Sequence, residues 1–107
     1  MSTENGTCVI FTTCPSNDEA ERLARGLVEQ NLAACVQITG IVSFYRWEGI
    51  VNKDPESLLI IKTKSTLYEA VECFIRGHHE YEVPEIIRIS IDGGLPAYLN
   101  WIQDSCK

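Results

Sequence analysis

Two adjacent histidines, His78 and His79, are the side chains of this sequence best suited to metal chemistry. Imidazole nitrogen is a common ligand for copper, zinc and nickel, and a thiolate such as that of Cys14 would favour copper. Adjacent helical side chains point about 100° apart, so both imidazoles can reach one ion only where the backbone leaves the helix. Gly77, directly before the pair, would permit this. The alternative is that protonated histidines stabilise the negative end of a helix dipole.

A second group of residues mixes aromatic rings, carboxylates and one lysine near the ends of the expected strands. Its members are Tyr45, Trp47, Glu48, Lys62, Tyr81, Glu82 and Glu85. Such a mixture either lines a small-ligand cleft or forms a wet subunit interface with aromatic anchors. The sequence contains no nucleophile elbow, phosphate-binding glycine loop or His-Glu-x-x-His motif, and no acid–base pair stands out. We therefore expect no catalytic residue, no enzymatic activity and no cofactor except a divalent cation.

The five cysteines are scattered and form no Cys-x-x-Cys motif, which argues against zinc-ribbon and iron–sulfur sites. The first six residues have neither the basic nor the apolar segment of an export signal, so we expect reduced thiols in a cytoplasmic protein. Cys8, Cys35 and Cys73 lie in strand or helix patterns and are expected in the core. Cys106, near the C-terminus, is expected to be exposed.

The length and charge of the chain restrict its class. Its 107 residues, 45% of them hydrophobic, suit one domain spanning residues 1–107, in which residues 1–6 are expected to be flexible. A formal net charge of −6 argues against nucleic acid as a partner, because phosphate binding needs a basic surface. No apolar run approaches the roughly 20 residues of a membrane span, so no membrane partner is expected.

Hydrophobic periodicity predicts four strands and three helices. The first helix carries a capping box, with Ser16 at its N-cap and Glu19 three residues later, and Asn31 suits the left-handed conformation that ends a helix. We expect strands at 7–13, 34–47, 50–63 and 85–91, and helices after Ser16, at 66–76 and from Pro96 onward. This α+β order is the ferredoxin-like βαββαβ arrangement with an extended middle hairpin and a C-terminal helix.

In such a fold the helices cover only one face of the sheet. The other face must be polar, be covered by the terminal helix, or meet another subunit. The middle hairpin carries Val42, Phe44, Tyr45 and Trp47 on alternating faces, and its long strands have unpaired edges. We therefore expect a homo-oligomer that buries the hairpin between Val42 and Leu59.

Several segments together resemble the CutA family of divalent-cation tolerance proteins, over almost the whole chain from Thr7 to Ile102. They are Phe11-Thr12-Thr13-Cys14-Pro15, Leu32-Ala33-Ala34-Cys35-Val36, Tyr45-Arg46-Trp47-Glu48-Gly49, Ile61-Lys62-Thr63, His79-Glu80-Tyr81-Glu82-Val83-Pro84-Glu85 and Tyr98-Leu99-Asn100-Trp101-Ile102. The resemblance implies a homotrimer similar in architecture to the PII signalling proteins, with tolerance of copper and other divalent ions and no established reaction.

Copper-binding members of that family use a cysteine near the end of the first strand and two adjacent histidines after the second helix. His78 and His79 match the histidines, whereas Thr12 stands at the position of the cysteine and Cys14 lies two residues later. The leading hypothesis is thus a non-catalytic metal-binding homotrimer that takes copper through His78, His79 and Cys14. The alternative is a PII-like trimer that binds a small molecule in intersubunit clefts lined by Tyr45, Trp47, Lys62, Tyr81 and Glu85.

Overall fold

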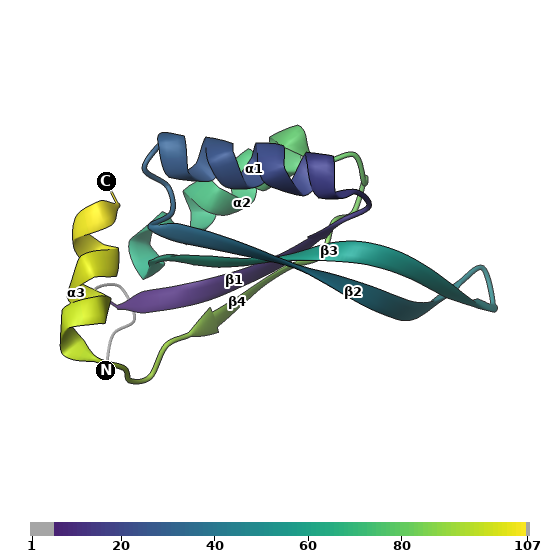
Figure 1. The fold of residues 1–107 in the computed structure, drawn as a ribbon. Coiled ribbons are helices and arrows are strands. Elements are labelled where there is room, and N and C mark those ends of the chain that lie inside the picture. Colours follow the sequence, from purple (N-terminus) through teal and green to yellow (C-terminus); the bar gives the residue numbers. More distant parts are fainter. Residues whose placement is uncertain (1–5, 107) are drawn as a thin grey trace.

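The structure, a computed structural model, describes residues 6–106 as four strands, one short 3-10 helix and three α-helices (Figure 1). In chain order these are β1 (Thr7–Cys14), α1 (Asn17–Glu29), β2 (Cys35–Trp47), β3 (Ile50–Lys64), η1 (Ser65–Leu67), α2 (Tyr68–His78), β4 (Ile86–Ser90) and α3 (Pro96–Ser105). Of the N-terminal segment expected to be flexible, residues 1–5 lie outside the described residues, while the carbonyl of Gly6 accepts hydrogen bonds from the Ser65 N–H and the Gln103 side chain.

The four strands form one antiparallel sheet in the order β2-β3-β1-β4. Helices α1 and α2 cover one face of this sheet, and α3 packs at one end of it, far from the tip of the β2–β3 hairpin (Figure 1). This arrangement confirms the predicted ferredoxin-like fold. The terminal helix leaves much of the second face uncovered, so it does not remove the need for another covering element.

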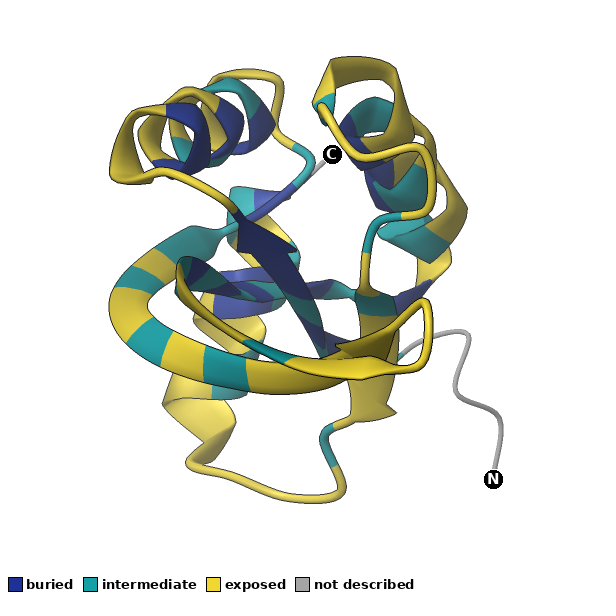
Figure 2. Cartoon of the chain, turned by 90° about the vertical axis from the view of Figure 1, so that its right-hand side faces the viewer, coloured by how far each residue is buried: buried dark blue, intermediate teal, exposed yellow. Residues whose placement is uncertain are grey.

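The core lies between α1, α2 and the inner face of the sheet (Figure 2). Alternate residues of β1 and β3 point inward, so that Ile10 pairs with Ile61 across the two central strands and both are fully buried. Against them pack Leu27 of α1 and Ile75 of α2, which lie on the apolar stripes of their helices. The sheet and the two helices are therefore held together by aliphatic packing.

The caps of α1 agree with the prediction. The Ser16 hydroxyl accepts a hydrogen bond from the backbone N–H of Glu19 at 3.2 Å, which satisfies one of the free donors of the first turn. At the other end Asn31 has φ 60°, the left-handed conformation that asparagine tolerates better than most residues. The chain can then turn at once toward β2.

The backbone conformation of Asn31 gives a direct test of this helix end. Asn31→Val is expected to lower the free energy of unfolding by about 1–2 kcal/mol, because a β-branched residue is strained at positive φ. Asn31→Gly should leave stability unchanged or raise it slightly. Urea unfolding followed by circular dichroism would measure both variants, and equal midpoints for Val and Gly would show that this conformation is not required.

Helix α2 begins and ends later than predicted. Residues 65–67 form the 3-10 turn η1, and the α-helix runs from Tyr68 through Gly77 to His78. Gly77 therefore does not terminate the helix as expected, because no side-chain or left-handed cap interrupts the backbone before His79. The consequence is that His78 is helical whereas His79 already has extended backbone.

Three of the cysteines differ from the prediction. Cys73 is exposed, because it lies on the outer side of α2 between the buried positions Val71 and Ile75. Cys106 is buried, because α3 packs against the sheet and places the Cys106 sulfur 3.6 Å from the Thr63 hydroxyl. Cys35 is half-buried instead of in the core, and all five thiols are free.

The β2–β3 hairpin extends well beyond the rest of the sheet. Strand β1 pairs with β3 only from Ser57 onward, so residues 50–56 of β3 are bonded to β2 alone. This two-stranded ribbon carries exposed Trp47, Ile50 and Val51 around its turn, and Trp47 is 64% exposed. An isolated two-stranded hairpin is at best marginally stable in water, so a covering element would stabilise this ribbon.

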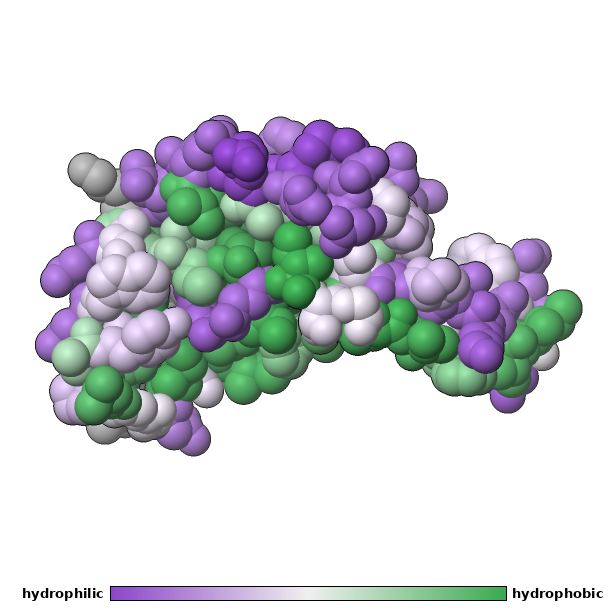
Figure 3. Space-filling view, viewed as in Figure 1, coloured by the Kyte–Doolittle hydropathy of each residue, from purple (hydrophilic) through white to green (hydrophobic). Residues whose placement is uncertain are grey.

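The sheet face opposite α1 and α2 is apolar as well. Ile87 and Ile89 of β4 pair with Phe11 and Val9 of β1 and are 48% and 47% exposed. Hydrophobic side chains also line the lower surface in the space-filling view, from the body of the molecule to the hairpin (Figure 3). Within residues 6–106, no helix is both long enough and apolar enough to cross a membrane.

Candidate metal site and acidic pocket

Three potential metal ligands meet where β1 ends. The Cys14 thiol, a Glu19 carboxylate oxygen and a ring nitrogen of His79 all lie within 4.8 Å of one another. Cys14 is the last residue of β1, Glu19 lies in the first turn of α1, and His79 follows α2. The three side chains lie close together because the connection between β1 and α1 is short and α2 ends over the same end of the sheet. Among residues 6–106 this is the one such group.

Glu19 is unusual because its carboxylate is buried beside the Cys14 thiol. The residue is only 2% exposed, and neither carboxylate oxygen has a hydrogen bond of normal geometry within the described chain. A buried carboxylate without compensation costs several kcal/mol if it is ionised. A cation bound beside this carboxylate would offset that cost.

The neighbouring thiol is strongly affected by the same environment. Burial, followed by the hydrogen bond to the Glu19 carboxylate and by its charge, raises the pKa of the Cys14 thiol from 9.0 to about 12. At neutral pH this thiol is protonated and unreactive. A metal ion bound here would displace its proton.

The hydrogen bonds of His79 determine which of its nitrogens carries the proton. The backbone N–H of Tyr81 donates to Nδ1 at 3.0 Å, so Nδ1 has a free electron pair. Nε2 then carries the proton and donates it to the Thr13 carbonyl at 2.6 Å. This is the neutral tautomer, the form that ligates metals, but one of the two bonds must open before a nitrogen can reach an ion.

His78 does not join this group. Its Nδ1 donates to the Phe74 carbonyl one helical turn earlier, at 2.8 Å, and its ring stacks on Phe74 with centroids 4.2 Å apart. The side chain is exposed. The two histidines diverge because the helix continues through Gly77 and ends between them.

Sequence reasoning assigned Glu19 to the helix cap and missed its place beside the thiol. The available signal was the short connection, since only Pro15 and Ser16 separate β1 from α1, and a residue in the first helical turn must lie near the strand end. Thr12, at the position of the family cysteine, is also buried, and its hydroxyl has no hydrogen bond within residues 6–106. Thr12 and Cys14 point to the same side of β1.

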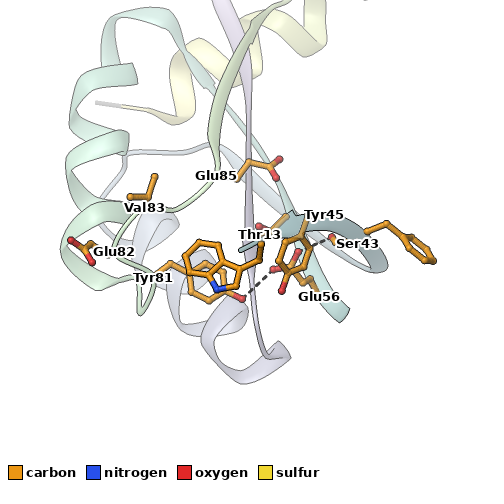
Figure 4. A pocket seen from close by; sticks show the side chains of 10 residues that line it. Thr13, Ser43, Tyr45, Glu56, Tyr81, Glu82, Val83 and Glu85 are labelled. Atoms are coloured by element: carbon orange, nitrogen blue, oxygen red, sulfur yellow. Dashed lines mark hydrogen bonds between the residues drawn. The ribbon is translucent and has the colours of Figure 1, made fainter. Parts of the chain in front are cut away.

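A separate pocket of about 790 Å³ lies between the β2–β3 hairpin and the loop after α2 (Figure 4). Its lining residues are Thr13, Ser43, Phe44, Tyr45, Trp47, Glu56, Tyr81, Glu82, Val83 and Glu85. Five residues of the predicted cleft group thus line it, whereas Glu48 and Lys62 do not. Lys62 instead donates to the Tyr98 hydroxyl at 3.2 Å, because it lies at the opposite end of β3 beside α3.

Hydrogen bonds fix the carboxylate at the base of this pocket. Glu56 accepts from the Ser43 hydroxyl at 2.6 Å and from the Tyr81 hydroxyl at 3.2 Å (Figure 4). Tyr45, on the same side of the hairpin, donates to Asp54. Burial, followed by the charge of Glu56, raises the pKa of Tyr81 to about 12, so this phenol remains a donor at neutral pH.

The structure is that of a small ferredoxin-like α+β protein in which three potential metal ligands lie together at the end of β1. The sequence model of a protein family described as CutA1 divalent ion tolerance protein matches residues 8–105. The chain therefore belongs to the CutA1 divalent ion tolerance family.

Individual relatives agree with this assignment. The crystal structure of CutA1 from Oryza sativa is 43% identical and superimposes with a TM-score of 0.93, covering 99% of this chain and 98% of that one. A protein from Archaeoglobus fulgidus named as a periplasmic divalent cation tolerance protein is 40% identical, with a TM-score of 0.90 over 92% of this chain and 97% of that one. "Protein CutA, chloroplastic" from Arabidopsis thaliana is 44% identical over 92% of this chain, which spans 55% of that relative's length. Since these names refer to other compartments, the relatives give no support to the cytoplasmic location expected from the sequence.

Proposed function

We propose that the protein is a non-catalytic homotrimer that binds a divalent cation, with copper preferred, at Cys14, Glu19 and His79. The observation that carries this proposal is the buried Glu19 carboxylate, whose oxygens make no hydrogen bond of normal geometry within residues 6–106, and one of which lies within 4.8 Å of a thiol and an imidazole nitrogen. A cation would remove the cost of burying that charge. The relatives' names, which refer to divalent-cation tolerance, support the same class of ligand.

The donor set supports a transition metal over magnesium or calcium. A thiolate and an imidazole are softer ligands than the oxygen shells that Mg²⁺ and Ca²⁺ prefer. Affinity for such mixed sites rises along the divalent series to copper and is lower again for zinc. We therefore expect Cu²⁺ to bind more tightly than Zn²⁺, Ni²⁺ or Co²⁺.

The uncovered surfaces support assembly. The unpaired ribbon of β2 and β3 and the apolar face of β4 would both be exposed in a monomer. Edge strands and apolar sheet faces of this kind favour association. The number three comes from the family resemblance described above.

Metal titration of variants tests the proposed ligands. Cys14→Ser and His79→Ala are each expected to weaken binding of Cu²⁺ and Zn²⁺ at least about 100-fold, since even second-shell changes cost 10–100-fold. His78→Ala should bind nearly as tightly as the wild type, because His78 lies outside the group. Anaerobic isothermal titration calorimetry would measure affinity and stoichiometry while avoiding oxidation of the thiols.

The pH dependence of binding provides a second readout. Binding should strengthen as pH rises and release protons, because the raised pKa of Cys14 leaves a proton for the metal to displace. If His78→Ala lost as much affinity as His79→Ala, or if Cys14→Ser bound normally, the proposed ligand set would be wrong. Melting curves of each metal-free variant would show that loss of binding is not loss of folding.

A further inference from the structure

A second pair of thiols lies at the end of β1 opposite the candidate metal site. Cys8 is the second residue of β1, and Cys106 follows α3 with extended backbone. Figure 1 shows α3 against the end of the sheet where β1 begins and β3 ends. Cys8 is 0% exposed and Cys106 is 7% exposed in the single chain. The pair is therefore enclosed within one subunit and does not depend on assembly.

Thr63 lies beside both of these thiols. It pairs directly with Cys8 across β1 and β3, and residues paired in this way have Cβ atoms about 4.5–5.5 Å apart on one face of the sheet. The Thr63 hydroxyl is also 3.6 Å from the Cys106 sulfur. Because this hydroxyl donates its one proton to the Leu32 carbonyl at 2.7 Å, the Cys106 thiol is the donor to the Thr63 oxygen. The two thiols thus border the same side chain.

Ser65 adds an unused hydroxyl to this cluster. The residue is 7% exposed, and its Oγ makes no hydrogen bond of normal geometry within residues 6–106. Burial raises the pKa of the Cys8 thiol, whereas the Ser65 hydroxyl and then the positive charge of Arg88 lower it, so both groups act on this sulfur. A buried hydroxyl without an acceptor is unfavourable, and an ionised sulfur would provide one. The surroundings of Cys8 therefore contain a donor and a positive charge that stabilise a thiolate.

The cluster offers ligands for a soft ion of low coordination number. Among residues 6–106 only the Cys14 group brings three ligand side chains together, so no further thiol, imidazole or carboxylate joins Cys8 and Cys106. Structural Zn²⁺ takes four ligands, and Mg²⁺ and Ca²⁺ take shells of oxygen. Thiolates select Cu⁺, which is stable with two of them. A Cu⁺ dithiolate carries one negative charge, which the nearby charge of Arg88 would offset.

We propose that Cys8 and Cys106 form a binding site for Cu⁺ inside each subunit. The ion replaces the two thiol protons, which pass to solvent, and two S–Cu bonds form with no change of oxidation state. Ser65 donates a hydrogen bond to the Cys8 thiolate in this complex. The bound ion ties the segment after α3 to β1. This site is separate from the proposed divalent-cation site and does not rest on it.

Competition with the chromogenic Cu⁺ chelator bicinchoninate, under anaerobic conditions with ascorbate, measures the affinity. A Cys14→Ser/Cys35→Ser/Cys73→Ser chain keeps only the two thiols of the proposed site. It should bind one Cu⁺ per chain. Addition of Cys106→Ser should weaken binding at least about 100-fold, because one of two direct ligands is lost and even second-shell changes cost 10–100-fold. Melting curves of the metal-free variants would show that each one folds.

A matched pair of serine variants tests the hydrogen bond to the thiolate. Ser65→Ala should weaken Cu⁺ binding about tenfold. Ser57→Ala removes a similarly buried hydroxyl at the other end of β3, paired with Cys14, and should leave binding unchanged. X-ray absorption at the copper edge then identifies the ligands. Two sulfur neighbours are expected, and a nitrogen neighbour would overturn the proposal.

Other results would also count against this site. Unchanged affinity after loss of Cys106, equal effects of the two serine variants, or tighter binding of Zn²⁺ than of Cu⁺ would each overturn it. A chain that binds no Cu⁺ but forms a Cys8–Cys106 disulfide with hydrogen peroxide would show that the two thiols are a redox pair instead. A Cys14→Ser chain that loses divalent-cation binding but keeps Cu⁺ binding separates this proposal from the proposed function.

Discussion

Replacing Ile87 and Ile89 together by aspartate is expected to convert a species of three times the 12.0 kDa chain mass into monomers. In the isolated chain these two side chains are about half exposed, so two carboxylates there would be solvated and the monomer fold should survive. In an oligomer that covers this face the same charges would lie in an apolar contact. Light scattering coupled to size-exclusion chromatography measures the mass directly.

The size of this effect follows from the cost of burying polar groups. Each uncompensated group costs about 1–3 kcal/mol in proteins, and two per subunit would make association less favourable by about 4 kcal/mol. That is roughly a thousandfold weaker association per interface. Arg22→Asp, on the exposed side of α1, is the matched control and should leave the mass unchanged. A wild-type chain that is already monomeric, or a double variant that keeps its mass with unchanged circular dichroism, would contradict an interface on this face.

Replacing Glu19 by glutamine is expected to stabilise the metal-free protein and to weaken metal binding. The carboxylate is 2% exposed and its oxygens make no hydrogen bond of normal geometry within residues 6–106, so a neutral isostere avoids the cost that burial imposes on the ionised form. The gain in unfolding free energy should be about 1–3 kcal/mol at neutral pH. The affinity for Cu²⁺ should fall at least about 100-fold, because a direct anionic ligand is lost.

Higher stability together with weaker metal binding distinguishes a metal ligand from a residue that only supports the fold. If the residue only supported the fold, its substitution would lower the free energy of unfolding of the protein. Any weaker metal binding would then follow from that loss of stability. Glu21→Gln in the same helix controls for the charge change, since Glu21 is exposed and its carboxylate accepts a hydrogen bond from the Asn17 side chain. Urea unfolding of the metal-free proteins, followed by titration of each, gives both quantities. If Glu19→Gln were less stable and bound metal normally, Glu19 would belong to the fold alone.

Most of the fold could be predicted because local patterns determine it. The β-branched and aromatic run of β1, the apolar stripe of α1 and the caps at Ser16 and Asn31 depend on residues a few positions apart, and all appear as expected. The end of α2 was placed wrongly because glycine permits a helix end without requiring one. The burial of Cys106 was missed for a related reason, since it depends on where α3 packs and not on its own neighbours in sequence.

The candidate site also has features that follow from sequence and features that depend on the tertiary structure. The sequence by itself determined that Cys14 and His79 are residue types able to bind metal, and that aromatic and acidic side chains cluster around the hairpin and the loop after α2. Only the tertiary structure decided that Glu19 joins Cys14 and His79, that His78 does not, and that Lys62 lies away from the acidic pocket. Side-chain type is a property of one position, whereas proximity depends on where β1 ends, where α1 starts and how far α2 continues. A buried carboxylate beside a thiol can arise only from that three-dimensional packing.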